Sequence, residues 1–413
     1  MLKKLTALTL AGLLTLSLAG CSLLELTTGN TTSVQEANSG TQSESAQSGS
    51  TQQTASGDTV TTIANTTSGG AIDGTDLFSN RDLTQTPDLS EATYLTVESG
   101  QDVTITAAGV YVLSGAATEV TVVVEAGDED KVQLVLDGVS ITNTDFPCIY
   151  VKNADKVFVT TAEGSDNTLA VTGTFTADGD TNTDAAIFSR DDLVLNGLGT
   201  LTVSSTDNGI SGKDDIKITG GTLNITCVSD AIEANDSIRI AGGEITISTR
   251  KDGLHAENDE DNTLGWIYIC GGTLNITAGD DGIHGTTIVQ IDDGTLNITA
   301  AEGIEGTWIQ INGGVINISA SDDGINGARK STAYTVTVEF NGGETTIVMG
   351  QGDTDGVDSN GNIVINGGTI DVTGQSAFDY DGTATYNGGT VIVNGEETTT
   401  RSEERRVGKE CRS

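Results

Sequence analysis

One phrase of fifteen residues recurs along the chain and limits what it can fold into. It reads GGTLNITAGDDGIHG from Gly271, and related versions begin at Gly220, Gly242 and Gly313. The paired glycines recur at steps of about 22 residues, with two longer steps of 29. Within each step, apolar and polar residues alternate over short runs, as in half-buried β-strands. One such repeat cannot bury its apolar side alone, so the pattern predicts stacked parallel strands around a shared core.

The repeats align well enough to predict which side chains face the core. Three short strands are expected in each repeat, which favours a parallel β-solenoid over a β-propeller with its longer blades of four strands. In the first strand the expected core positions are Leu223, Ile245, Leu274, Leu296 and Ile316, with Ile225, Ile247, Ile276, Ile298 and Ile318. The second strand contributes Ile232, Leu254, Ile283, Ile304, Ile325 and Val357, and the third Ile240, Ile269, Ile291, Ile311, Phe340 and Ile365. Asparagines between the first-strand core positions are expected to face outward.

Both ends of the chain differ from this pattern. Residues 1–20 read as a lipoprotein signal peptide, because two lysines precede an apolar run that ends in Leu-Ala-Gly before Cys21. We expect Cys21 to be lipidated and 21–90 to form a disordered Ser/Thr-rich tether. The folded domain is predicted at 91–400, with strands from about Tyr94, and is expected to continue further in the natural chain. We interpret 401–413 as a sequencing-adapter artefact.

The charge of the chain limits its partners. There are 59 acidic and 19 basic residues, a formal net charge of −40. Nucleic acid is therefore excluded as a natural partner, and direct contact with anionic lipid is disfavoured. We expect a monomer on the extracellular face of the cell membrane, held there only by its N-terminal lipid. Three cysteines remain within the repeats, Cys148, Cys227 and Cys270, and are expected to be buried free thiols.

Acidic residues recur at one corner of successive repeats. The positions are Asp230, Asp252, Asp281, Glu302, Asp323 and Asp355, and further acids such as Glu233, Glu305 and Asp358 follow three residues later. Adjacent strands lie about 4.8 Å apart, where two carboxylates repel by roughly 3 kcal/mol at an effective dielectric of 20. Such a row favours bound cations, and Ca²⁺ suits a set of oxygen ligands. We predict calcium ligands among Asp230, Asp252, Asp281, Glu302, Asp323, Asp353, Asp355 and Asp358. The alternative is a solvated acidic edge.

Histidine and tryptophan also fall at equivalent positions. His255 and His284 share one position on adjacent repeats, which favours a stacked polar ladder over a zinc site. Trp266 and Trp308 share an outward position two repeats apart, so they are predicted to form a sugar-binding platform unless a loop covers them. Insertions at 257–262 and 327–334 leave from the acidic corner, and the second contains Arg329 and Lys330. We predict that these two basic residues contact carbohydrate.

Segment 103–168, the later DGI repeats and DSNGNIVINGGT together resemble the bacterial lipid-anchored β-helix carbohydrate-binding family. The resemblance covers about 90–400. It implies a right-handed single-stranded parallel β-helix, bound calcium, and binding of plant cell-wall polysaccharide, notably polygalacturonate (pectin) and cellulose. With the repeats, it gives an expected solenoid of three strands and about 22 residues per coil.

Binding without catalysis is the favoured function. A polysaccharide lyase would need a basic residue beside calcium, which Arg250, Lys251, Arg329 or Lys330 could supply. A hydrolase would need two carboxylates at a defined separation, and the sequence offers too many to choose a pair. A structural surface adhesin with no sugar preference is the third alternative.

Overall fold

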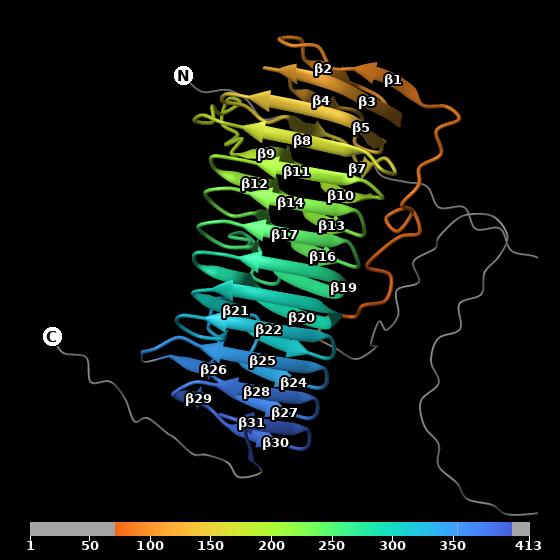
Figure 1. Ribbon diagram of the computed structural model, residues 1–413. Coiled ribbons are helices and arrows are strands. Elements are labelled where there is room, and N and C mark those ends of the chain that lie inside the picture. Colours follow the sequence, from red (N-terminus) through yellow and green to blue (C-terminus); the bar gives the residue numbers. More distant parts are fainter. Residues whose placement is uncertain (1–70, 353, 399–413) are drawn as a thin grey trace, which may run out of the picture. The chain divides into compact units, whose positions relative to one another are not determined.

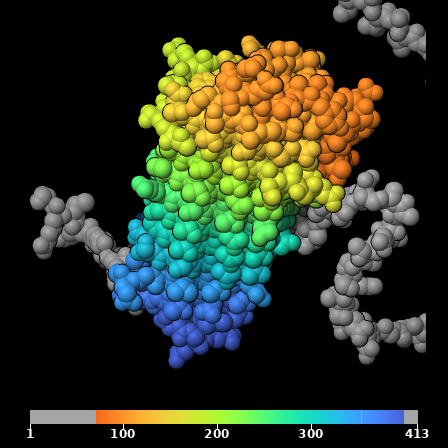
Figure 2. All heavy atoms as spheres, turned by 45° about the horizontal axis from the view of Figure 1, so that its top comes forward, coloured from red at the N-terminus to blue at the C-terminus, as the bar shows by residue number. Residues whose placement is uncertain are grey.

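The computed structural model describes residues 71–352 and 354–398. By its internal contacts the chain divides into residues 1–57, which lie outside the described part, and residues 58–413. In the described part, 32 strands belong to one hydrogen-bonded sheet. Figure 1 shows these strands stacked in chain order, and Figure 2 shows the same succession of layers at the surface. We call one passage of the chain around this tube a layer.

The strands lie on three walls of the tube. The first wall contains β8 (Asp166–Val171), β11 (Thr200–Ser204), β14 (Thr222–Thr226), β17 (Glu244–Ser248), β22 (Val315–Ala320), β25 (Glu344–Met349), β28 (Thr369–Thr373) and β31 (Thr390–Val393). The second contains β2 (Val103–Ile105), β4 (Val122–Glu125), β6 (Ile149–Asn153), β9 (Ala185–Ser189), β12 (Asn208–Gly212), β15 (Ile232–Ala234), β18 (Leu254–Ala256), β23 (Ile325–Gly327), β26 (Asp355–Ser359) and β29 (Ser376–Tyr380). The third contains β1 (Thr93–Thr96), β7 (Lys156–Thr161), β10 (Asp192–Gly197), β13 (Asp215–Ile218), β16 (Ser237–Ile240), β24 (Thr337–Phe340), β27 (Asn362–Ile365) and β30 (Ala384–Tyr386).

Five long strands continue from one wall to the next. They are β3 (Gly109–Thr118), β5 (Lys131–Asn143), β19 (Trp266–Thr277), β20 (Asp281–Ala300) and β21 (Glu302–Ile311). On each wall, a strand pairs in parallel with the strand of the next layer, as β14 does with β17 and β15 with β18. The last strand, β32 (Glu396–Thr398), is the exception, because it pairs antiparallel with β31.

The predicted architecture, a right-handed single-stranded parallel β-helix solenoid with three strands and about 22 residues per coil, is wrong, although the chain is all-β. The described strands form a single sheet that closes around the core as a barrel-like tube with additional strands. β20 illustrates the difference, because it runs unbroken for 20 residues and pairs with β18, β19, β21 and β22. Alternation in the sequence predicts strands, but it does not show whether the backbone ladder breaks at a corner.

The predicted core positions are confirmed. On the first wall, Leu223 pairs with Ile245 and Ile225 with Ile247, and all four are buried. The core residues predicted on the second and third walls are buried as well, and they join one apolar cluster that extends from Val97 to Val391. Because a strand turns alternate side chains to opposite faces, the residues between them face outward. Cys148, Cys227 and Cys270 are buried free thiols, as predicted.

Paired glycines make one corner of the tube. Gly272 has a φ of 90°, a left-handed conformation that favours glycine. A Cβ atom added to Gly271 would lie only 2.6 Å from the Ala241 carbonyl oxygen of the preceding layer. The pair therefore permits both the turn and the close stacking of adjacent layers.

The segment from Ala71 to Ala92, which we call the strap, runs along the third wall before the first strand (Figure 1). The Ile72 amide donates to Gln290 Oε1 at 2.6 Å, and Gln85 Oε1 accepts the Gly197 amide at 2.8 Å. Its apolar residues pack on Ala241, Tyr268 and Cys270; they are Ile72, Leu77, Phe78 and Leu83. The predicted disordered tether included 71–90, and for these residues the structure corrects that expectation. Four apolar side chains spread over a polar segment leave too weak a periodicity to predict this packing.

The described residues contain no helix that is long and apolar enough to cross a membrane. The predicted signal peptide, the lipidation site Cys21 and the segment 401–413 all lie outside the described residues.

Candidate functional site at the acidic corner

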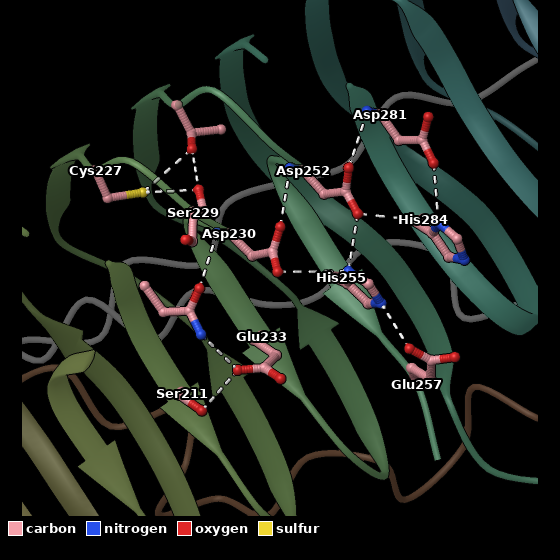
Figure 3. A network of polar contacts seen from close by, with 12 residues as sticks. Ser211, Cys227, Ser229, Asp230, Glu233, Asp252, His255, Glu257, Asp281 and His284 are labelled. Atoms are coloured by element: carbon pink, nitrogen blue, oxygen red, sulfur yellow. Dashed lines mark hydrogen bonds and ion pairs between the residues drawn. The ribbon is translucent and has the colours of Figure 1, made fainter. Parts of the chain in front are cut away.

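Two files of polar side chains follow the second wall from layer to layer. The acidic file consists of Asp230, Asp252, Asp281, Glu302, Asp323 and Asp355. The companion file lies three residues further along each layer and consists of Glu233, His255, His284, Glu305, Asn326 and Asp358, which pair in that order. The predicted alignment of acids, layer on layer, therefore brings these side chains together (Figure 3).

Carboxylates of the acidic file serve as backbone caps for the next layer. Asp230 Oδ1 accepts the amide of Asp252 at 3.0 Å, and Asp252 Oδ1 accepts the amide of Asp281 at 2.9 Å. Asp323 Oδ1 accepts the amide of Asp355 in the same way, at 3.0 Å. Each of these carboxylates thus uses one oxygen for folding, which offsets part of the repulsion along the file. The second oxygen of each carboxylate remains for another partner.

The histidines supply that partner in the middle of the corner. The rings of His255 and His284 are stacked with centroids 4.7 Å apart and planes 9° apart. His255 Nδ1 lies 2.8 Å from Asp252 Oδ2, and His284 Nδ1 lies 2.8 Å from Asp281 Oδ2 (Figure 3). Each Nδ1 is thus paired with a carboxylate of its own layer, although Asp252, His255 and His284 also offer ligand atoms within 4.8 Å of one another. The predicted stacked polar ladder is confirmed.

The charge on His255 follows from its surroundings. Burial lowers the pKa of His255, but the hydrogen bond and charge of Asp252 raise it more, so that its pKa is about 9. Burial raises the pKa of Asp252, whereas the two histidines lower it, and the net pKa of this acid is below its usual value. His255 is therefore a cation near neutral pH and neutralises the file at this layer.

Lys330 neutralises the next layer. Its Nζ lies 2.8 Å from Glu305 Oε2, and the same carboxylate oxygen lies 3.2 Å from His284 Nδ1. Burial lowers the pKa of Lys330, but Glu305 raises it more, and the net pKa is above the ordinary value. The insertion that carries Lys330 thus returns to the acidic corner, as its position in the sequence predicted. Arg329 beside it is exposed.

The last layers of the corner have acids without a nearby cation. Burial is the main cause that raises the pKa of Asp358 to about 7, and neighbouring carboxylates are the second. Burial and neighbouring acids also raise the pKa of Asp323 to about 6, and that of Glu302 to about 7. No Lys, Arg or His among the described residues forms an ion pair with Asp323, Asp355 or Asp358. The corner is therefore neutralised in its middle layers and has excess negative charge in its last ones.

The predicted metal ligands therefore fall into two groups: those in the middle layers, where cations neutralise the corner, and those in the last layers, where no cation among the described residues does. At the corner, Asp252, Asp280 and Asp281 form a group composed only of carboxylates, with oxygens within 4.8 Å of one another. Asp252 and Asp281 are already bound to histidine, and Asp252 also accepts a backbone amide, so part of their ligand capacity is used within the fold. In the last layers, Asp323, Asp355 and Asp358 are half-buried acids without a cation partner among the described residues. Asp353, another predicted ligand, lies outside the described residues.

The predicted tryptophan platform lies on the third wall, away from the acidic corner. Trp266 is half-buried, the guanidinium carbon of Arg239 lies 4.6 Å from its ring centroid, and the ring packs on the same Ala241, Tyr268 and Cys270 cluster as the strap. Trp308 is also half-buried, and its ring centroid lies 6.2 Å from that of Tyr334. Trp308 Nε1 is buried and has no hydrogen-bond partner among the described residues. The structure thus brings covering residues to both rings.

The sequence of this domain matches a family of carbohydrate-binding domains. The family of carbohydrate-binding domain-containing proteins matches residues 99–356, more than half of the chain, and the chain belongs to this family. A carbohydrate-binding domain-containing protein of Acetivibrio thermocellus is 44% identical over 126 residues. That match covers 30% of this chain and 44% of the relative, so the chain spans less than half the length of that protein.

A solved structure described as the polysaccharide lyase-like protein from C. thermocellum, in its gadolinium derivative, is 33% identical to this chain. The likeness covers 54% of this chain and 92% of that chain, with a TM-score of 0.46. At this TM-score the likeness carries no argument about fold or function.

Proposed function

We propose that this carbohydrate-binding protein binds acidic plant cell-wall polysaccharide, above all polygalacturonate, through calcium ions held in the last layers of the acidic corner. The observation that carries the proposal is the excess charge at Asp323, Asp355 and Asp358. These side chains offer only oxygen ligands, which suit Ca²⁺. A bound calcium ion with open coordination positions supplies a bridge to uronate oxygens, because it accepts 6–8 oxygen ligands.

The net charge of the protein decides the form of this binding. A chain of formal charge −40 repels a polymer that carries a carboxylate on every sugar. Direct ion pairing is limited further because Lys330 is already bound to Glu305. The exposed Arg329, next to Lys330 in the sequence, is one basic group that could orient a uronate chain. A bridging cation therefore explains acidic-glycan binding better than direct contacts do.

Binding without catalysis is also favoured by Lys330. A β-elimination needs a neutral base beside the substrate. The pKa of Lys330 is raised by Glu305, after the opposing effect of burial, so the ammonium stays protonated near neutral pH. This lysine is therefore unsuited to be the base of a lyase.

The test is an incubation with polygalacturonate and calcium. We expect retention of the polymer without unsaturated uronate or new reducing ends. Excess chelator should abolish retention by protein that remains folded, and added calcium should restore it. Sodium chloride should weaken retention only modestly. Retention in excess chelator contradicts calcium bridging, and product formation shows a lyase or hydrolase.

The sequence-based proposals for neutral glycan and for location have their own tests. Cellulose retention by Trp266→Ala and Trp308→Ala, with melting as a control for folding, decides whether either tryptophan contacts sugar. For location, we propose an extracellular protein anchored through Cys21. The Cys21→Ser variant should then be released from the membrane fraction.

A further inference from the structure

A shallow groove lies on the first wall, across β17, β19, β20, β22 and β25. Its volume is about 570 Å³. Apart from buried isoleucines, the residues that line it are amides, hydroxyls and one valine, namely Thr246, Ser248, Asn275, Thr277, Asn297, Thr299, Asn317, Ser319, Thr346 and Val348. None of the lining residues is ionisable. This surface is separate from the acidic corner and from the two tryptophans.

The amides in the groove form one ordered file. Asn297 Nδ2 donates to Asn275 Oδ1 at 2.9 Å, and Asn317 Nδ2 donates to Asn297 Oδ1 at 3.0 Å. The strand register places these three side chains directly above one another. Each amide has more donor and acceptor capacity than these bonds use, so the file is held in place and can still bind a ligand.

A second file, of hydroxyl groups, runs parallel to the amides. Ser248, Thr277, Thr299 and Ser319 occupy equivalent positions in four successive layers. Their hydroxyls have no side-chain hydrogen bond to other described residues, and all four residues are exposed. Amide and hydroxyl positions thus repeat at the layer spacing of about 4.8 Å, which is comparable to the length of one hexose unit.

The lack of charge identifies the kind of ligand. The groove crosses several layers without an ionisable side chain, although the protein has a net charge of −40. Its lining therefore forms no ion pair with a charged ligand. Amides and hydroxyls exchange neutral hydrogen bonds with polyhydroxyl molecules. A straight, open surface of this kind suits an extended chain that follows the axis of the tube.

We infer that this groove is a second glycan-binding site, which takes a neutral, extended polysaccharide with one sugar unit opposite each layer. The inference rests on the carbohydrate-binding function, but not on calcium. Because contact is through single neutral hydrogen bonds repeated along the groove, affinity should increase with the length of the oligosaccharide.

The test uses the variant Asn297→Ala with Thr299→Val. Both side chains are exposed on a strand, so the fold should tolerate the change. Binding of cellohexaose, measured by calorimetry with calcium and with chelator, should weaken about tenfold, as expected from losing one or two neutral hydrogen bonds. Asn224→Ala is the matched control, because Asn224 has the equivalent position in an earlier layer outside the groove.

The outcomes separate this inference from the calcium proposal. We expect chelator to leave cellohexaose binding unchanged while it abolishes polygalacturonate retention. Parent-like cellohexaose binding by the folded double variant overturns the inference, as does an equal loss in the Asn224→Ala control. Loss of polygalacturonate retention alone would assign the groove to the acidic glycan and also overturn it. If the calcium-bridging proposal fails but the double variant still weakens cellohexaose binding, the groove remains supported as a second glycan-binding site.

Discussion

His255 stacks on His284 while it bonds to Asp252 in its own layer, so a cation lies inside a file of carboxylates. Its Nδ1 also lies 3.7 Å from Asp230 Oδ2 in the preceding layer. One imidazolium therefore faces two layers of acid. The stack offsets, within the protein, the repulsion that a row of carboxylates creates.

Stability should depend on pH through His255. Burial disfavours the positive charge on His255, but Asp252 favours it more. The pKa of His255 therefore rises from 6.5 in the free side chain to about 9. The stabilisation is thus fully present below about pH 6.5 and is lost as the pH rises through 9. We expect His255→Gln to cost up to roughly 3 kcal/mol at pH 6 and much less above pH 9, as melts across this range would show. Arg329→Gln, an exposed control, should cost little at either pH; an equal cost of His255→Gln at both ends contradicts the prediction.

Calcium should stabilise the last layers of the corner. A ligand at 100 times its Kd adds about 2.7 kcal/mol to the free energy of unfolding. We expect calcium to raise the melting midpoint of the parent and not that of Asp323→Asn with Asp358→Asn. Asp137→Asn, an exposed control, should respond as the parent does. A calcium response that survives in the double variant places the ion elsewhere.

Without calcium, the same acids should make the fold sensitive to rising pH. Burial and neighbouring carboxylates raise the pKa of Asp323 to about 6 and of Asp358 to about 7, above the ordinary 3.8. Groups with a raised pKa contribute stability below their unfolded pKa and lose it as the pH rises through the folded value. In chelator, the melting midpoint of the parent should fall between about pH 4 and 7, and that of the double variant should fall less. Equal slopes for the two proteins would falsify this assignment.

The strap should depend on one buried carboxylate. Asp82 is 1% exposed and lies 3.7 Å from Lys156 Nζ and 3.8 Å from Lys217 Nζ. Asp82→Ala leaves two largely buried lysines without this partner, and removing one member of a buried ion pair costs about 3–5 kcal/mol. We expect a lower melting midpoint and faster proteolysis within 71–92. Asp88→Ala, an exposed position on the strap, is the control and should change the free energy of unfolding by less than about 0.5 kcal/mol.

Trp266 should contribute to packing whether or not it binds sugar. It packs on the cluster of Ala241, Tyr268 and Cys270, on which the strap also packs, and Arg239 lies over its ring, so Trp266→Ala removes both contacts. We expect a cost of about 2–3 kcal/mol, less than for a fully buried tryptophan. Trp266→Phe, which keeps part of the ring, should recover some of this loss in a thermal melt. An unchanged midpoint for Trp266→Ala would show that its packing on this cluster does not stabilise the fold in solution.

The sequence by itself determined which side chains face the core and which lie above one another. Leu223 and Ile245 are buried and paired as predicted, because strand alternation has a period of two and the repeat length sets the register. The same two periods placed Asp252 over Asp230 and His284 over His255. Local pattern is sufficient here because each layer contacts chiefly its neighbours.

Only the tertiary structure decided how these side chains are used. The sequence could not show that β20 continues around the tube, since backbone pairing at a corner depends on the adjacent layers. Nor could it show that Lys330 reaches Glu305, or that the strap covers the wall beside Trp266, because these contacts join segments of irregular sequence. The neutralised middle and the charged last layers of the corner follow from those contacts. Charge in a file depends on which cation lies within reach in space, and sequence spacing does not set that distance.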